Sequence, residues 1–253
     1  MYHYDANFYS FLSSFALRSA TVIVPIVADA LPIRSVADFG CGQGAWLSVW
    51  QKSGAAIFGV DGPYVDQTRL LIPTEAFQPA DLSQPLNLGR RFDLAQSLEV
   101  AEHLPAAAAQ TFVRSLVCHS DHILFSAAVP GQGGERHINE QEPKFWRPLF
   151  AAEGYRPVDL VRPAVRNNPA VQRWYACNTI LYVKTAALDA LSSTVRQYVV
   201  VDDQPLTNYW PLGDRIRQGV VRKLPSAVVD GLSRINAARV ASQAHRRSRK
   251  PSN

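Results

Sequence analysis

Residues 36–50 read Val36-Ala37-Asp38-Phe39-Gly40-Cys41-Gly42-Gln43-Gly44-Ala45-Trp46-Leu47-Ser48-Val49-Trp50: an apolar strand, three alternating glycines and an apolar-periodic helix. Glycine has no Cβ and accepts positive φ, so the backbone can pass close beneath a ligand. The following helix directs its free N–H groups and its positive dipole end to the same place. This stretch therefore predicts a loop that holds a nucleotide-type cofactor.

The length and composition of the chain suit one large domain, alone or with an appendage. It has 253 residues, 47% of them hydrophobic, and we expect no transmembrane segment because no apolar run approaches roughly 20 residues. The start, Met1-Tyr2-His3-Tyr4-Asp5, lacks the features of a signal peptide. Cys41, Cys118 and Cys177 stand singly and indicate neither a disulfide framework nor a zinc site. These features predict a cytoplasmic protein.

The positive charge is confined to the C-terminus. The formal net charge is +5, yet no acidic residue follows Asp230, whereas six basic residues do. The rest of the chain is nearly neutral and offers no face for a polyphosphate, so we expect no nucleic-acid partner. Residues 239–253 are expected to be a frayed basic tail, with contact to an anionic partner as the alternative.

Strand and helix patterns alternate along the chain. Continuous apolar strands separated by helices predict an α/β, doubly wound, mostly parallel sheet covered on both faces. The expected strands are 36–39, 56–61, 76–80, 92–98, 122–129, 155–161 and 178–184. The expected helices are 6–29 (with a break at 21–25), 43–53, 64–71, 105–118, 142–152, 186–198 and 214–238. The expected organisation is an N-terminal helical lid (1–33), a cofactor-binding domain (34–184), a helical appendage (185–238) and the tail.

Three acidic residues bear on the identity of the cofactor. Gly40-x-Gly42-x-x-Ala45 also satisfies the dinucleotide fingerprint, so the glycines alone leave NAD open. Asp61, at the end of the second strand, can accept hydrogen bonds from ribose hydroxyls with either cofactor. Asp38 suits a ligand that carries an ammonium or sulfonium charge, and Asp81 follows the third strand, where an adenine amino group could bind. The pattern favours an adenosyl sulfonium compound over NAD.

The fourth strand ends in Phe92-Asp93-Leu94-Ala95-Gln96-Ser97-Leu98-Glu99-Val100-Ala101-Glu102-His103-Leu104-Pro105. With the features above, the chain resembles the class I S-adenosylmethionine-dependent methyltransferases, whose fold is a seven-stranded Rossmann-like sheet. It is most similar to the small-molecule branch related to the O-methyltransferases of ubiquinone biosynthesis. The resemblance covers roughly residues 34–184. It implies S-adenosyl-L-methionine as cofactor, held by Gly40, Cys41, Gly42, Gly44, Asp61, Gly62, Asp81, Leu82, Ser97, Leu98 and Glu99.

Two histidines are the candidates for the catalytic base. His103 follows the fourth strand at the expected mouth of the site, although it could instead orient the turn by bonding Glu99 or Glu102. His137 lies in the glycine-rich segment 131–141, where bracing of the loop is the alternative. That segment is similar to bacterial methyltransferases of uncertain substrate, some of them in glycan or secondary-metabolite pathways. No spacing of His, Asp or Glu indicates a metal site.

The sequence thus predicts an enzyme that transfers a methyl group from S-adenosylmethionine to a small molecule, most readily at oxygen. A base near neutral pKa assists such a transfer, commonly by about 10²–10⁴-fold. Two other readings stay open: a non-catalytic partner subunit that keeps the cofactor fold, and an NAD-dependent oxidoreductase. A nucleic-acid methyltransferase is disfavoured by the near-neutral body of the chain and by the absence of an Asn/Asp-Pro-Pro-Tyr/Phe motif for a flipped base. The oligomeric state and the identity of the acceptor do not follow from the sequence.

Overall fold

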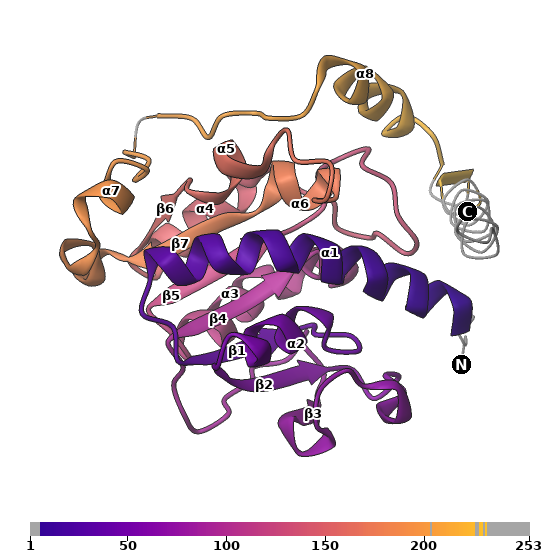
Figure 1. Ribbon diagram of the computed structural model, residues 1–253. Coiled ribbons are helices and arrows are strands. Elements are labelled where there is room, and N and C mark those ends of the chain that lie inside the picture. Colours follow the sequence, from indigo (N-terminus) through magenta and orange to yellow (C-terminus); the bar gives the residue numbers. More distant parts are fainter. Residues whose placement is uncertain (1–5, 203, 226–227, 230, 232–253) are drawn as a thin grey trace, which may run out of the picture.

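A seven-stranded sheet forms the centre of the molecule (Figure 1). The computed structural model describes residues 6–202, 204–225, 228, 229 and 231, with only the backbone of residues 6–12. The strand order is β3-β2-β1-β4-β5-β7-β6, in which β7 is antiparallel to β5 and β6 and the other pairs are parallel. The predicted α/β, doubly wound, mostly parallel sheet is therefore confirmed. The strands are β1 (Ser35–Phe39), β2 (Ala56–Asp61), β3 (Phe77–Pro79), β4 (Leu94–Leu98), β5 (His122–Ser126), β6 (Tyr155–Val158) and β7 (Ile180–Lys184).

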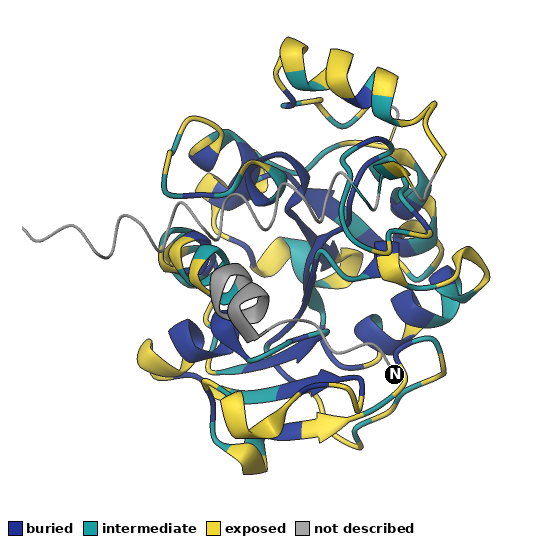
Figure 2. Ribbon diagram, turned by 90° about the vertical axis from the view of Figure 1, so that its right-hand side faces the viewer, coloured by how far each residue is buried: buried dark blue, intermediate teal, exposed yellow. Residues whose placement is uncertain are grey.

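Helices cover both faces of the sheet because successive strand side chains point to opposite faces. Leu124 of β5 packs in the core cluster with helices of one face, whereas Ile123 and Phe125 pack in the cluster of the other. The first face carries α1 (Ala6–Ala30), α2 (Ala45–Lys52), α5 (Val161–Val165) and α6 (Arg173–Asn178). The second face carries α3 (Ala109–Val117) and α4 (Pro143–Ala152). Figure 2 shows the sheet as a buried layer between half-exposed helices.

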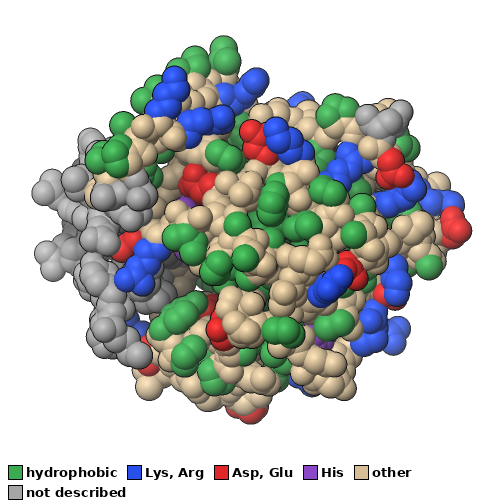
Figure 3. Space-filling model, turned by 180° about the vertical axis from the view of Figure 1, so that it is seen from behind, with side chains coloured by type: hydrophobic (Ala, Val, Ile, Leu, Met, Phe, Trp, Pro, Cys, Tyr) green, Lys and Arg blue, Asp and Glu red, His purple; other side chains and the backbone are tan. Residues whose placement is uncertain are grey.

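The segment after β7 returns to the sheet and then leaves it. Val199 forms a bridge to Val158 of β6, and the buried Arg162 donates to the carbonyl oxygen of Thr207 at 3.0 Å. Beyond the buried Trp210, α8 (Leu212–Val221) projects from the body and exposes apolar and basic side chains (Figure 3). A further short helix, α7 (Ser193–Arg196), precedes this return. The predicted basic tail, 239–253, lies outside the described residues.

Several helix predictions are wrong in position. The predicted break at 21–25 is absent, because α1 continues through Pro25. A proline inside a helix costs about 3 kcal/mol or more, and burial of Ile23, Val24 and Val27 offsets this cost. The predicted helix 64–71 is only a 3₁₀ turn, Gln67–Arg69. The N–H of Leu71 instead donates to the carbonyl oxygen of Gln43 in the glycine loop. This N–H is therefore not available for the hydrogen bond to the preceding turn that a helix would require.

Other helices and strands begin or end at residues that differ from the prediction. The strand predicted to reach residue 161 ends at Val158, and the strand predicted to begin at residue 178 begins at Ile180, directly after α6. The helix predicted over 186–198 is a 3₁₀ segment, Thr185–Ala190, followed by the short α7. The helix predicted over 214–238 is described as α8, which ends at Val221 and is followed by a turn.

One helix passes a length and composition test for a membrane span. The window Ser13–Ala30 of α1 has a mean hydropathy of 1.3, so the sequence does contain one stretch of that kind. A core helix passes the same test, and Ala20, Ile23 and Val27 on this helix are fully buried against the domain. This window is therefore weak evidence for a membrane.

Candidate functional site

The glycine loop follows β1 at the carboxyl end of the sheet. Gly40 has φ of 92° and its N–H donates to the carbonyl oxygen of Val60 at 2.7 Å, which turns the chain sharply out of the sheet. A Cβ on Gly40 would lie only 2.3 Å from Cγ2 of Val100, so only glycine fits there. Gly44, with φ of 82°, precedes the first residue of α2. The loop is thus clamped between β2 and the segment after β4.

Asp61 ends β2 beside this loop and is almost fully buried. Its Oδ2 accepts from the N–H of Gly42 at 2.7 Å, and its Oδ1 accepts from the N–H of Gly62 and the hydroxyl of Tyr64, each at 2.6 Å. Burial raises the pKa of Asp61, and these donors oppose the rise. The carboxylate is held in one orientation, with Tyr64 at the position that a ligand hydroxyl could take.

Asp38 is the second buried carboxyl group at this edge. It lies opposite Gln96 of β4 in the sheet register and is 3% exposed. Burial raises the pKa of Asp38 to about 7; the Gln96 side chain opposes this, and the Asp61 carboxylate adds to it. Burial also raises the pKa of the Cys41 thiol well above its usual range, so Cys41 is not a nucleophile here.

These residues fit the cofactor that the sequence resemblance implies. A Cβ on Gly42 would meet nothing within 4 Å, so the loop backbone faces open space at this point. Two buried carboxyl groups, Asp38 and Asp61, stand on either side of the loop. A ligand with a positive charge and a ribose would supply the partners that such groups require.

The other predicted cofactor contacts follow neighbouring strands. Leu82 is buried, whereas Asp81 is exposed and accepts from the N–H and hydroxyl of Ser83 at 2.9 and 2.7 Å. Ser97 and Leu98 lie in β4, next to β1, and the Ser97 hydroxyl donates to the carbonyl oxygen of Phe39 at 2.8 Å. The structure therefore brings Ser97 close to the glycine loop and leaves Asp81 at the far side, after the edge strand β3.

Glu99 adopts an unusual conformation where β4 ends. Its φ is 58°, a strained value that non-glycine residues adopt mostly where function requires it. Its N–H donates to the carbonyl oxygen of Ser126, and its carboxylate accepts from Gln132 at 2.6 Å and Asn178 at 3.2 Å. Asn178 in turn accepts from the indole N–H of Trp210 at 3.0 Å. Burial raises the pKa of Glu99.

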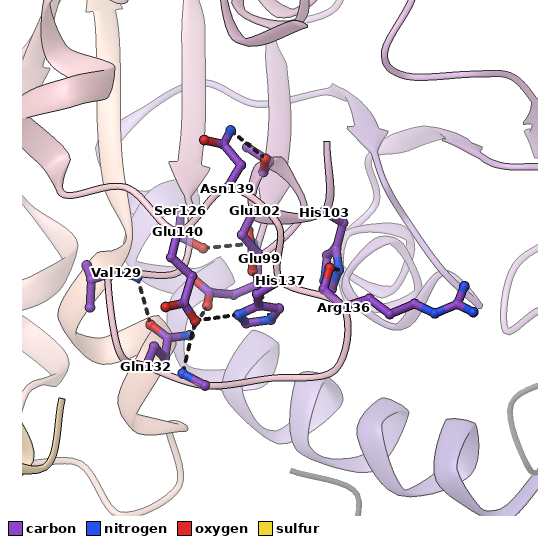
Figure 4. Close-up of polar contacts among 12 residues, drawn as sticks. Glu99, Glu102, His103, Ser126, Val129, Gln132, Arg136, His137, Asn139 and Glu140 are labelled. Carbon is purple, nitrogen blue, oxygen red and sulfur yellow. Dashed lines mark hydrogen bonds and ion pairs between the residues drawn. The ribbon is translucent and has the colours of Figure 1, made fainter. Parts of the chain in front are cut away.

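Glu102, His103 and His137 converge next to Glu99 (Figure 4). Glu102 is 1% exposed, and neither of its carboxylate oxygens has a hydrogen-bond partner among the described residues. Oε1 of Glu102 lies 4.0 Å from Nε2 of His137, whose Nδ1 lies 2.8 Å from Glu140. The ring of His103 packs edge-on against that of His137, with its Nδ1 3.3 Å from the carbonyl oxygen of Arg136.

The ionisation of this cluster follows from its surroundings. Burial, and next the Glu99 carboxylate, raises the pKa of Glu102 well above its usual range. Packing of the His103 ring, and next the charge of His137, lowers the pKa of His103. A pKa of about 4 keeps His103 neutral at neutral pH, with a lone pair free to accept a proton, but makes it a weaker base than an ordinary imidazole.

Several members of this site were not predicted from the sequence. Gln132 and Asn178 bind Glu99 from distant parts of the chain, and Tyr64 covers Asp61. Glu140 accepts from the N–H groups of Gly131 and Gly133. The repeated glycines of segment 131–134 could have predicted a loop whose backbone N–H groups bind a carboxylate.

Comparison with known proteins agrees with the fold. Residues 14–116 match the model of a methyltransferase domain family. Among solved structures, DesVI of Streptomyces venezuelae has a TM-score of 0.56 at 16% identity, covering 72% of this chain and 100% of that one. A candidate O-methyltransferase of Nostoc punctiforme has a TM-score of 0.53 at 14% identity, covering 70% and 59%.

A third similar structure is the magnesium protoporphyrin IX methyltransferase ChlM of Synechocystis with bound S-adenosylmethionine. Its TM-score is 0.47 at 22% identity, with coverage of 67% of this chain and 80% of that one. No protein of curated function matches the sequence significantly.

Proposed function

We propose that this chain is a class I S-adenosylmethionine-dependent methyltransferase and that it methylates a hydroxyl oxygen of a small molecule. The observation that carries the choice of oxygen is the pair of imidazoles, His103 and His137, beside the end of β4. A hydroxyl must lose a proton as the bond to carbon forms, and a neutral imidazole is suited to receive it.

The cofactor supplies a methyl group on a sulfonium sulfur, which departs with its electron pair as S-adenosylhomocysteine. We propose that Asp61 binds the ribose hydroxyls and that Asp38 stabilises the positive charge of the methionine portion. The glycine loop binds that portion through its backbone, and Asp81 with Leu82 contacts the adenine. Positioning of this kind can lower a barrier by about 7–11 kcal/mol at best.

On the acceptor side, Glu99 is proposed to orient the substrate from its fixed, strained position. One of the two imidazoles receives the hydroxyl proton while the acceptor oxygen bonds to the methyl carbon. Glu140 keeps His137 in place through the 2.8 Å contact with its Nδ1.

The test uses pairs of acceptors that differ only in the reacting atom. Purified protein is incubated with cofactor labelled in its methyl group and with matched phenol–aniline and sugar–aminosugar pairs. We expect label on hydroxyl compounds only. Transfer to the amine members alone would overturn the choice of oxygen, and a failure of calorimetry to detect S-adenosylhomocysteine would overturn the cofactor assignment.

Cofactor affinity should depend on pH through Asp38. Its pKa of about 7 in the free protein falls when a cationic ligand binds, so binding releases a proton. Titration calorimetry should give binding about tenfold weaker at about pH 5.5 than at about pH 7. The Asp38→Asn protein should lose this dependence; the same slope in the variant would assign it to Asp61, the other buried carboxyl group at this edge, whose pKa burial also raises.

The ionisation of Asp38 affects the stability of the fold in the opposite direction: stability falls as the pH rises, whereas cofactor affinity increases. Because its pKa is raised in the folded chain, protonation of Asp38 stabilises the ligand-free protein below about pH 4, and this stability is lost as the pH rises through about 7. Thermal unfolding of the wild type and Asp38→Asn should therefore diverge as the pH increases.

The His103→Ala protein should lose about 10²-fold in kcat with an unchanged Kd for S-adenosylhomocysteine. The ring packs at the acceptor side, not on the glycine loop. His122→Ala is the matched control, because Nδ1 of His122 bonds the carbonyl oxygen of Asp93 at the opposite end of the sheet. Equal rates in the wild type and His103→Ala would show that His103 takes no part in catalysis and only orients its turn.

Two broader features belong to the same proposal. The described chain has three free cysteines, which suits the cytoplasm. Residues 1–33 are proposed as a lid over the cofactor, supported by the 2.9 Å hydrogen bond from Ser13 of α1 to Gln43 of the glycine loop.

A further inference from the structure

We propose that Glu102, His103 and His137 form a binding site for one divalent transition-metal cation. Each residue offers one ligand atom, and the three atoms lie within 4.8 Å of one another. Two imidazole nitrogens and a carboxylate oxygen are a set of ligands that Mn²⁺, Fe²⁺, Co²⁺ and Zn²⁺ accept. The sequence spacing gave no sign of it, because His137 reaches the other two only through the loop after β5.

The first argument is the state of Glu102. It is 1% exposed, and neither oxygen makes a hydrogen bond of good geometry among the described residues, although the backbone N–H groups of Glu102 and Ala128 lie close enough to oppose the rise of its pKa. Its one ion-pair contact in that part of the chain is His137 at 4.0 Å, and Figure 4 shows the guanidinium of Arg136 extending away from the cluster. A protonated Glu102 would still leave a buried hydroxyl without an acceptor, whereas a cation would satisfy the group.

The second argument is the orientation of the imidazoles. Nδ1 of His103 faces the carbonyl oxygen of Arg136, which only accepts, and Nδ1 of His137 faces the carboxylate of Glu140. In a neutral ring, an acceptor at Nδ1 favours the proton on that nitrogen, which leaves the lone pair of Nε2 for a cation. A histidine that binds a metal through one ring nitrogen usually donates a hydrogen bond from the other ring nitrogen to a carboxylate or a backbone carbonyl oxygen.

The third argument is the support behind Glu140. Its two oxygens accept from the N–H groups of Gly131 and Gly133 at 2.7 and 3.0 Å, so the loop itself fixes the outer carboxylate. Ligands about 2.1 Å from one cation lie about 3.0–3.4 Å apart. Glu102 and His137 are 4.0 Å apart and no pair of the three ligand atoms is more than 4.8 Å apart, so movements of less than about 2 Å bring them into this range.

The catalytic role of the cation rests on the proposed function, whereas the site itself does not. A cation bound here, beside Glu99 at the end of β4, would coordinate the acceptor hydroxyl and lower its pKa. In the metal-bound protein this role replaces the direct proton transfer to an imidazole described under the proposed function: both imidazoles would be ligands, and the hydroxyl proton would pass to solvent. Full methyl transfer in the presence of EDTA would overturn this role.

The test is a titration of the EDTA-treated, dialysed full chain with Co²⁺, followed by its visible absorption. We expect one Co²⁺ per chain, and at least about tenfold weaker binding by Glu102→Gln and by His137→Gln. Glu142→Gln and His122→Gln are matched controls, since Glu142 pairs with the exposed Lys144 and His122 lies at the other end of β5. Both controls should bind Co²⁺ like the wild type.

A second measurement separates loss of ligands from loss of fold. S-adenosylhomocysteine should bind Glu102→Gln and His137→Gln as it binds the wild type, and Co²⁺ should raise the melting temperature of the wild type only. Equal Co²⁺ affinity in the wild type and Glu102→Gln, or no binding by the wild type, would overturn the metal site. If Co²⁺ binds as expected and S-adenosylhomocysteine does not, the proposed function fails and the metal site stands.

Discussion

Replacing Asp61 by alanine is expected to weaken binding of S-adenosylhomocysteine by about 100-fold or more. The buried carboxylate is fixed by the N–H groups of Gly42 and Gly62 and has only the hydroxyl of Tyr64 to exchange for ribose hydroxyls. Hydrogen bonds to a charged group contribute about 1.5–3 kcal/mol each, and removal of Asp61 also releases the glycine loop. Titration calorimetry with S-adenosylhomocysteine and with NAD measures the loss and should show no NAD binding in either protein.

The matched control is Asp66→Ala. Asp66 is an exposed carboxylate that accepts from the N–H and hydroxyl of Thr68, at 3.0 and 2.6 Å. This variant should bind the cofactor like the wild type. An Asp61→Ala protein with wild-type affinity would show that the ribose lies elsewhere.

Gly40→Ala should lower the free energy of unfolding by about 2–4 kcal/mol. The φ of 92° costs a non-glycine residue about 1 kcal/mol or more, and the added Cβ would overlap Val100 at 2.3 Å. In a chain of this size the melting temperature should fall by about 10 °C. Cofactor affinity should fall as well, because the loop must shift away from Val100.

Two further variants distinguish the cost of the positive φ angle from the cost of the overlap with Val100. Gly54 has the same φ of 92°, yet a Cβ there would meet nothing within 4 Å, so Gly54→Ala should show only the smaller cost of the dihedral angle. The double variant with Gly40→Ala and Val100→Ala should recover part of the loss. If Gly40→Ala and Gly54→Ala unfold at the same temperature, the clamp between the glycine loop and Val100 does not stabilise the fold.

Local patterns predicted the elements that position the cofactor. The strand predicted at 56–61 is β2, and the helix predicted at 142–152 begins and ends within one residue of α4. Trp46 and Trp50, four residues apart in the apolar-periodic helix, are both buried. These features depend on side-chain periodicity and on glycines within one short stretch, so neighbouring residues contain the necessary information.

Long-range contacts account for what the sequence did not predict. The segment 64–71 forms no helix because Leu71 donates to the glycine loop, and Pro25 is tolerated because its helix is packed on the core. Likewise, no pattern near Glu99 indicates that Gln132 and Asn178 would bind it. The residues of the glycine loop, but not the partners of the acceptor side, could therefore be named from the sequence.

The bond from Trp210 to Asn178 has a consequence for the order in which a newly made chain acquires its site. The glycine loop and Asp61 are synthesised early, and their partners lie in the first half of the chain. Asn178, which binds Glu99, has its own acceptor oxygen satisfied only after Trp210 has emerged from the ribosome. Because a domain generally folds as a unit, the acceptor side cannot be complete until synthesis has passed Trp210.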